Sequence, residues 1–176
     1  MSNMKVRRLV PAEAPAYREL MLKAYAEHPD AFTSSHAERA SLPLEWWQSR
    51  LGVVSEPRDV VLGAFADDRL AGVAGISFES REKARHKATL FGMYVLPAYR
   101  HKGCGRALVL AALAHARSRD GVMLVQLTVT DGNDSARLLY EDCGFVRFGL
   151  EPFAVAVGST FVSKIHMWRK LDSISQ

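Results

Sequence analysis

The most restrictive feature of this sequence is an apolar helix pattern between two strand patterns in the middle of the chain. Residues 103–119 carry Ala, Leu and Val on most faces of a helix, so this helix is expected to pack against a sheet. The apolar segments before and after it, Ala88–Val95 and Val122–Thr130, are predicted strands. Two parallel strands joined by a helix form a right-handed crossover. The sequence therefore predicts one β-α-β unit at the centre of the fold.

Further strand patterns flank this unit on both sides. Asp59–Ala66 and Leu70–Phe78 are apolar runs separated by three polar residues, which predicts a hairpin. The other expected elements are a strand at Lys5–Val10, helices at 11–28, 43–51 and Asp134–Asp142, a long loop at 30–42, and a closing strand pair at Phe145–Gly149 and Phe161–Leu171. The resulting order, β-α-α-β-β-β-α-β-α-β-β, predicts a mixed α/β (α+β) sheet with helices on both faces.

Length and composition favour one domain over residues 1–176. Its 48% hydrophobic and 24% charged residues are typical of a folded chain, and its apolar runs are far shorter than a membrane span. Two cysteines without ligand spacing predict neither a disulfide framework nor a metal site, and a cytoplasmic location is expected. The net charge of +4 suits an acidic ligand, but the basic residues are too dispersed to predict nucleic-acid binding.

A glycine turn rich in basic residues opens the apolar helix. It reads YRHKGCGRAL over residues 99–108 and follows a predicted strand. The free backbone N–H groups of the first helical turn can bind phosphate there together with the helix dipole, and Gly103 and Gly105 leave the backbone accessible. The spacing matches neither a dinucleotide-binding loop nor a Walker loop. A surface turn without a ligand is the alternative.

A second motif, TDGNDSARLLYEDCGF, follows the next predicted strand. Asn133 and Tyr140 are seven residues apart, which places them on nearly one face of a helix. The same residues are compatible with a structural role, in which Asn133 caps the helix and Tyr140 packs in the core. Neither motif alone distinguishes a binding site from ordinary packing.

Taken in this order and spacing, the two motifs resemble those of the GNAT superfamily of acetyl-CoA-dependent N-acetyltransferases. The matching residues are Val95, Pro97, Arg100, Gly103, Gly105, Leu108, Asn133, Ala136, Leu139, Tyr140, Gly144 and Phe145. The resemblance implies a mixed, mostly antiparallel sheet of six to seven strands around the central crossover. It also implies direct transfer of an acetyl group from acetyl-CoA to a primary amine of a small molecule, amino acid or peptide.

The family also implies roles for individual residues. The N–H groups of the loop would bind the coenzyme A pyrophosphate. The main chain at the end of the preceding strand would bind the pantetheine arm and polarise the acetyl carbonyl. Tyr140 would be the general acid. The residues implied to bind the cofactor are Met93, Tyr94, Val95, Arg100, His101, Lys102, Gly103, Cys104, Gly105, Arg106 and Asn133.

The general base is left open by the sequence. Thr89 stands where protein-lysine members of the family carry a glutamate, and a threonine cannot deprotonate an ammonium. Glu79, Glu82 and His86 are the candidates, with solvated surface charge as their alternative role and a water relay as the alternative mechanism. A weak base favours an α-amine, because its pKa is lower than that of an alkylamine.

The acceptor is expected over the open side of the splayed strands, near residues 30–42 and 151–160. The stretch EHPDAF offers acidic and aromatic groups to a cationic amine, namely Glu27, His28, Asp30 and Phe32, although an ordinary helix-ending loop explains the same residues.

Three alternatives accompany this interpretation. Within the same class, the chain is a protein lysine or N-terminal acetyltransferase. Outside it, the chain is a non-catalytic module that binds acyl-CoA as a sensor. A homodimer that pairs through the closing strands is compatible with either.

Overall fold

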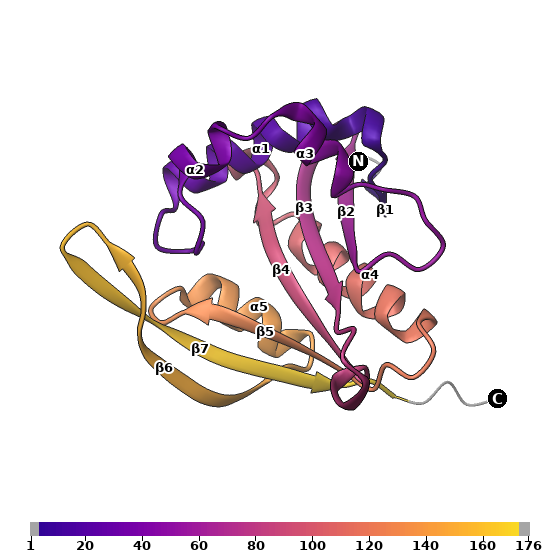
Figure 1. Cartoon of the computed structure of the whole chain (residues 1–176). Coiled ribbons are helices and arrows are strands. Elements are labelled where there is room, and N and C mark those ends of the chain that lie inside the picture. The colour runs from indigo at the N-terminus through magenta and orange to yellow at the C-terminus, as the bar shows by residue number, and fades with distance from the viewer. Residues whose placement is uncertain (1–3, 173–176) are drawn as a thin grey trace.

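The computed structural model describes residues 4–172 and contains a seven-stranded sheet covered by helices on both faces (Figure 1). The strands lie in the order β1-β2-β3-β4-β5-β7-β6, and neighbours are antiparallel except for the pair β4 and β5. This confirms the predicted fold class. The strands are β1 (Met4–Arg8), β2 (Asp59–Ala66), β3 (Arg69–Phe78), β4 (Lys87–Val95), β5 (Leu124–Thr130), β6 (Val146–Val157) and β7 (Thr160–Lys170).

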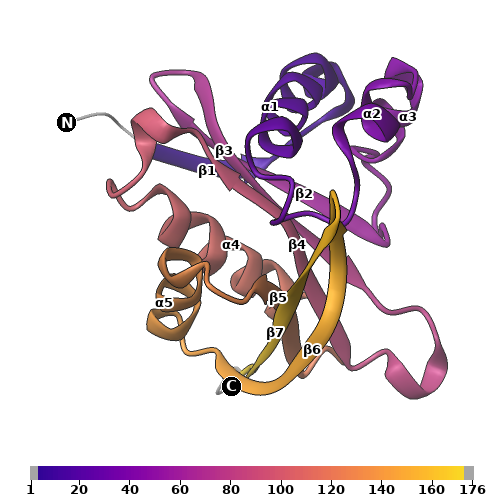
Figure 2. The same ribbon diagram turned by 90° about the vertical axis from the view of Figure 1, so that its left-hand side faces the viewer.

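The helices fall into two groups along the chain. The α-helices are α1 (Ala14–Glu27), α2 (His36–Ala40), α3 (Leu44–Ser49), α4 (Cys104–Ser118) and α5 (Asp134–Asp142), and the 3-10 turns are η1 (Pro11–Glu13), η2 (Glu82–Ala84) and η3 (Pro97–Tyr99). Figure 2 shows α1, α2 and α3 on one face of the sheet and α4 and α5 on the other. Each group therefore closes its own hydrophobic core against the sheet.

The predicted β4-α4-β5 crossover is present. Leu108, Val109, Ala112, Leu113 and Ala116 of α4 are fully buried, because the i, i+4 spacing of apolar residues turns one broad face of the helix to the sheet. On the opposite face, a second core centres on Trp47 of α3 and on apolar residues of α1. The site described below lies where the sheet between these two cores opens.

Two sequence expectations differ from the structure. Residues 30–42, expected to be a loop, contain the short helix α2, which begins at a capping box. The Ser35 hydroxyl accepts from the Glu38 N–H, and the Glu38 carboxylate accepts from the Ser35 N–H. The closing strand β6 does not end at Gly149 but continues to Val157 through register shifts at 147–149 and 151–155. Pro152 lies within the second shift. A proline is tolerated there because β6 is an edge strand and pairs on one side only.

The sheet splits between β4 and β5. Their parallel pairing covers only Lys87–Leu124, Ala88–Val125 and Thr89–Gln126. From this shared end the two strands diverge, as Figure 1 shows, and β4 beyond Thr89 has no partner on its β5 side. The unpaired edge gives a ligand access to backbone donors and acceptors.

Candidate active site

A β-bulge in β4 shapes the reactive end of the opening. Register is lost between Val73 and Gly75 of β3, and Gly92 of β4 adopts a left-handed φ of 56°. The extra residue reverses the alternation of the strand, so that Leu90 and then Met93 turn toward the core under α4, while Tyr94 packs in the opposite core. Gly92 stands inside the predicted strand, and a glycine in such a position is a sequence sign of a bulge. The bulge could therefore have been predicted.

Six consecutive backbone N–H groups are free where η3 leads into α4. The N–H of Arg100 donates to the Pro97 carbonyl and that of Ala107 to the Gly103 carbonyl. Between them, in the part of the chain that the structure describes, the N–H groups of residues 101–106 donate to no protein acceptor. They lie at the N-terminus of a fifteen-residue helix, where the helix dipole favours an anion.

The two glycines of the turn have different roles. Gly103 is the N-cap of α4 with φ 81°, and a Cβ there would meet no atom within 4 Å, so the backbone is open to a ligand. A Cβ on Gly105 would lie 3.0 Å from Leu139 and 3.2 Å from Met93. Gly105 therefore serves close packing inside the protein, whereas the sequence analysis expected both glycines to expose the backbone.

The basic side chains of the turn are held by protein carbonyls. Arg100 Nε donates to the Val95 carbonyl at 2.9 Å, and Lys102 Nζ donates to the Ala98 carbonyl at 2.8 Å. Arg106 reaches the Asp142 carbonyl at 3.5 Å, while His101 is exposed with φ 58°. The donors that this turn offers to an anion are therefore mainly its backbone N–H groups.

Tyr140 lies in the wall of the opening beside Met93. Its hydroxyl points to the Met93 sulfur at 3.6 Å, and burial raises the pKa of the phenol far above its usual value. A thioether is a weak acceptor, so the phenol keeps its proton and can donate it to a better one. The buried position agrees with both earlier interpretations, core packing and general acid.

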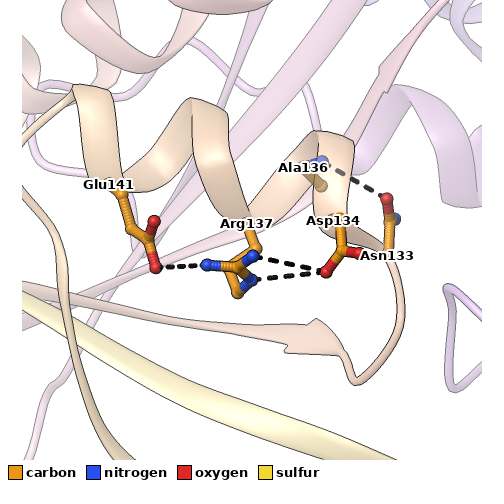
Figure 3. Close-up of polar contacts among 5 residues, drawn as sticks. All are labelled: Asn133, Asp134, Ala136, Arg137 and Glu141. Atoms are coloured by element: carbon orange, nitrogen blue, oxygen red, sulfur yellow. Dashed lines mark hydrogen bonds and ion pairs between the residues drawn. The ribbon is translucent and has the colours of Figure 1, made fainter.

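Asn133 caps α5 at the rim of the same opening. Its side-chain oxygen accepts from the Ala136 N–H at 3.3 Å, and Arg137 bridges Asp134 and Glu141 on the outer face of the helix (Figure 3). The cap role considered from the sequence is therefore present. Asn133 also lines the cleft, so the residue that caps α5 forms part of the cleft wall.

A cleft of about 320 Å³ connects Met93, Asn133 and Tyr140 to the opposite face of the sheet. It passes between the diverging ends of β4 and β5 and continues under α1, α2 and α3. Its lining residues are Tyr17, Met21, Tyr25, Ala31, Phe32, Thr33, Ser34, Arg39, Trp46, Trp47, Arg50, Thr89, Leu90, Phe91, Gly92, Met93, Thr128, Val129, Thr130, Asn133, Ala136, Tyr140 and Lys164.

The candidate bases are not brought together with Tyr140. Glu79 lies beside Lys87 at the closed end of β4, about 20 Å along the strand from Met93. Hydrogen bonds from Arg81 lower the pKa of the Glu79 carboxyl to about 2, which makes it a weak base. Glu82 is exposed in η2, and neither it nor His86 lines the cleft. Thr89 does line it.

Of the stretch expected to receive the amine, Phe32 lines the cleft, but Glu27, His28 and Asp30 do not. Glu27 accepts a hydrogen bond from the Tyr94 hydroxyl at 2.9 Å, and His28 lies against the Tyr94 ring. The side chain of Asp30 does not line the cleft, and its carbonyl accepts from the Thr130 hydroxyl. The cleft carries Arg39, Arg50 and Lys164 instead, which sequence reasoning missed.

Known proteins resemble this chain in sequence and in fold. The model of the acetyltransferase (GNAT) family matches residues 19–145. A mycothiol acetyltransferase from Thermobispora bispora is 32% identical over 85% of this chain and 48% of its own length. An N-alpha-acetyltransferase RimI from Mycobacterium tuberculosis is 38% identical over 55% of this chain and 58% of its own length. The chain spans about half the length of the curated relatives that it matches.

Solved structures agree on the fold. A GNAT-family acetyltransferase from Streptococcus pneumoniae superposes with a TM-score of 0.86 at 24% identity, covering 97% of this chain and 100% of that one. The yncA protein of Salmonella typhimurium, solved with its cofactor acetyl-CoA, gives 0.78 at 23% identity, covering 99% and 98%. The chain therefore belongs to the GNAT acetyltransferase family, a class of acyltransferases that depend on acetyl-CoA.

The residues present fit this cofactor. The free N–H run at 101–106 suits a diphosphate, and the unpaired edge of β4 suits a chain of amides that pairs as a strand does. Within residues 4–172 there is no group of three or more side chains that could hold a metal ion, and no helix is long and apolar enough to cross a membrane.

Proposed function

We propose that this protein transfers an acetyl group from acetyl-CoA directly to a primary amine of a small molecule, amino acid or peptide. The single observation that carries this proposal is the free N–H run at 101–106. It follows β4, whose unpaired edge leads to the cleft lined by Met93 and the protonated Tyr140. The names of the relatives, mycothiol acetyltransferase and N-alpha-acetyltransferase, support an amine acceptor.

The cofactor supplies an acetyl thioester, and the chain supplies its position. The backbone N–H groups of His101, Lys102, Gly103, Cys104, Gly105 and Arg106 would hold the diphosphate, with the Arg100 side chain supporting the turn from below. The main chain of Met93, Tyr94 and Val95 would bind the pantetheine arm, and its donors would polarise the acetyl carbonyl. Asn133 would contact the end of the arm.

Tyr140 holds the proton that the leaving sulfur needs. Its hydroxyl stands at the wall of the cleft with only the Met93 sulfur as acceptor, and its burial keeps it protonated at neutral pH. It therefore donates a hydrogen bond wherever negative charge develops beside Met93.

The amine is expected to lose its proton through water. Among residues 4–172, no carboxylate or histidine side chain lines the cleft. Glu79 lies in a neighbouring hollow that shares Thr89, Phe91 and Arg50 with the cleft. Glu79 and Glu82 stay candidates for a base that acts through a water chain. A weak base of this kind favours an amine with a low pKa, such as an α-amine.

Release of thiol from acetyl-CoA across a panel of primary amines, with the product identified by mass, tests the proposal. We expect turnover with at least one class of amine, and calorimetry should detect coenzyme A binding. Binding without any turnover would favour the sensor module instead. Turnover only with intact proteins or long peptides would favour the protein lysine or N-terminal acetyltransferase.

Several further expectations stay predictions. A homodimer would use the exposed apolar side chains on β6 and β7, which include Phe148, Leu150 and Phe161, and sedimentation measures it. A cytoplasmic location is tested by cell fractionation. The expectation that the chain binds neither nucleic acid nor membranes is tested by gel-shift and vesicle-sedimentation assays.

A further inference from the structure

The part of the cleft beyond the reaction centre is positively charged. Arg39, Arg50 and Lys164 line it, and in the part of the chain that the structure describes no Asp or Glu side chain does. Within residues 4–172, none of these three cations forms an ion pair with a carboxylate. A cleft that had only to receive an ammonium group would be expected to carry the opposite charge.

Lys164 is occupied by the protein itself. Its ammonium donates to the Thr130 hydroxyl at 2.8 Å, the Ala31 carbonyl at 3.0 Å and the Asp30 carbonyl at 3.4 Å. An ammonium has three donors, so this set uses all of them. Lys164 therefore fixes the segment after α1 and leaves Arg39 and Arg50 as the free cations of the cleft.

Arg39 and Arg50 are held in place by aromatic rings rather than by acids. The two guanidinium groups lie 4.6 Å and 5.0 Å from the centre of the Trp46 ring, and Arg50 also lies 5.4 Å from that of Phe91. Arg39 donates to the Ser34 hydroxyl at 2.7 Å, but its Nε is buried without a partner. The indole N–H of Trp47 is likewise buried and unpartnered in the described chain.

Tyr17 and Tyr25 line the same cleft as the two guanidinium groups. Burial raises the pKa of Tyr17 and of Tyr25, and the positive charges of Arg39 and Arg50 oppose that rise for each of them. The four side chains therefore form one cluster of donors, in which both phenols stay protonated at neutral pH. A buried donor without an acceptor raises the free energy of the folded state, and a bound anion would remove this penalty by accepting the hydrogen bond.

Nearby carboxylates are occupied elsewhere. Glu38 is exposed and accepts from the Ser35 N–H in the capping box of α2. Asp59 and Glu79 share the neighbouring hollow with Arg50, but Asp59 accepts from the Ser77 hydroxyl and Glu79 pairs with Arg81. Among residues 4–172, neither Arg39 nor Arg50 therefore has a carboxylate as an ion-pair partner.

We propose that the acceptor carries an anionic group, a carboxylate or phosphate, in addition to its amine, and that Arg39 and Arg50 bind this group. The proposal rests on the proposed function and specifies its substrate class. The amine points toward Met93 and Tyr140, and the anion lies at the Trp46 end of the same cleft. Guanidinium groups suit both carboxylates and phosphates because their paired N–H donors match the oxygen pairs of either anion.

Matched acceptor pairs test this proposal in the purified protein. Each pair differs only in the anion: an amino acid and its carboxamide for the carboxylate, and an amino sugar phosphate and its free amino sugar for the phosphate. We expect kcat/KM to be at least about 10- to 100-fold higher for the anionic member of one pair, the effect of a hydrogen bond to a charged group. The better pair identifies the anion.

Variants assign the effect to the two arginines. Arg39→Gln and Arg50→Gln should each raise KM about 10- to 100-fold for the anionic acceptor and change kcat/KM for its neutral counterpart far less, so that the preference for the anion is lost. Arg39→Lys should restore part of the affinity. Arg58→Gln is the control, because Arg58 lines the neighbouring hollow but not the cleft, and it should change neither constant. Thermal midpoints of all variants separate misfolding from lost recognition.

Calorimetry of the same pairs with the coenzyme A-loaded protein provides a second measurement, which holds even if no amine is acetylated. Preferential binding of anionic members that Arg39→Gln or Arg50→Gln abolishes would support the anion site while the proposed transferase function fails. Equal use or equal binding of neutral and anionic members, or no binding of either, would overturn the proposal.

Discussion

The Tyr140 hydroxyl is deeply buried, and the Met93 sulfur that it points to is a weak hydrogen-bond acceptor. The Tyr140→Phe substitution removes only the hydroxyl that points to the Met93 sulfur. We expect kcat to fall about 10²- to 10⁴-fold, the usual loss of a general acid, while the Kd for coenzyme A stays within about twofold. Steady-state kinetics and calorimetry measure the two effects. An unchanged kcat would show that Tyr140 serves only packing.

Gly103 permits a prediction with a matched control. It has φ 81° and open space at its Cβ position, and Gly121 beyond the other end of α4 has φ 79° and the same open space. Alanine at either position should cost about 1–2 kcal/mol of stability, because both adopt a left-handed conformation. Only Gly103→Ala should also weaken coenzyme A binding, because it alone adjoins the free N–H run. Equal affinities in both variants would remove this turn from the site.

The titratable side chains around the cleft predict an unusual pH profile. Hydrogen bonding from Arg81 lowers the pKa of Glu79 to about 2, so this group stays ionised and adds no step near pH 4–5. Burial raises the pKa of Tyr140, so its protonated form persists beyond the ordinary phenol value. We expect log kcat/KM to rise with pH up to the pKa of the acceptor amine and then to level off. A fall between pH 8 and 10 would contradict this assignment of Tyr140.

At the scale of elements, predictability followed local signals. β2 and α5 have the predicted bounds, because Asp67 and Asp68 adopt the positive φ angles of a hairpin turn and Asn133 caps a helix that ends before Gly144. The predicted strand ended at Gly149, whereas β6 continues past Pro152, a residue that normally interrupts a strand, to Val157. Pairing with β7 overrides that break, which is a tertiary effect.

The candidate site shows the same division between local and tertiary information. The free N–H run could be predicted because it depends on a turn that directly precedes an apolar helix. The cluster of Arg39 and Arg50 could not be predicted. Arg39 of α2 and Arg50 after α3 meet at the Trp46 ring only because both helices pack on α1. Positions in short helices after a polar segment give no periodic pattern from which a shared cleft can be read.

Lys164 of β7 fixes the segment that leads from α1 into α2. Lys164→Met keeps the buried alkyl chain but leaves the Ala31 carbonyl without this donor, so we expect a loss of about 1–3 kcal/mol of stability. The acceptor KM should rise as well, because Phe32 and Ser34 in this segment line the cleft. Lys170→Met, at an exposed position of the same strand, should change neither. Unfolding in urea and acceptor kinetics measure both, and an unchanged KM would mean that the segment is held by other contacts.

The whole molecule consists of two parts of one sheet joined at a narrow end. Strands β1 to β4 and strands β5, β7 and β6 share only three residue pairs, at 87–89 and 124–126. Beyond them, the parts are connected by α4 and by the contacts of Lys164 and Thr130 with residues 30–31. A ligand that occupies the opening touches both parts, so its binding energy adds directly to the stability of their arrangement.

Coenzyme A should therefore stabilise the molecule as a unit. At a concentration 100-fold above its Kd, the free energy of unfolding should rise by about 2.7 kcal/mol, which corresponds to roughly 5–10 °C in Tm for a chain of this size. Hydrogen exchange should slow at the free N–H groups of 101–106 and at the open edge of β4 from Leu90 to Val95 in the same titration. Tyr140→Phe should retain both effects, because the phenol holds neither group. Protection of 101–106 alone would show that only the diphosphate is bound, and the strand edge would then have no part in holding the cofactor.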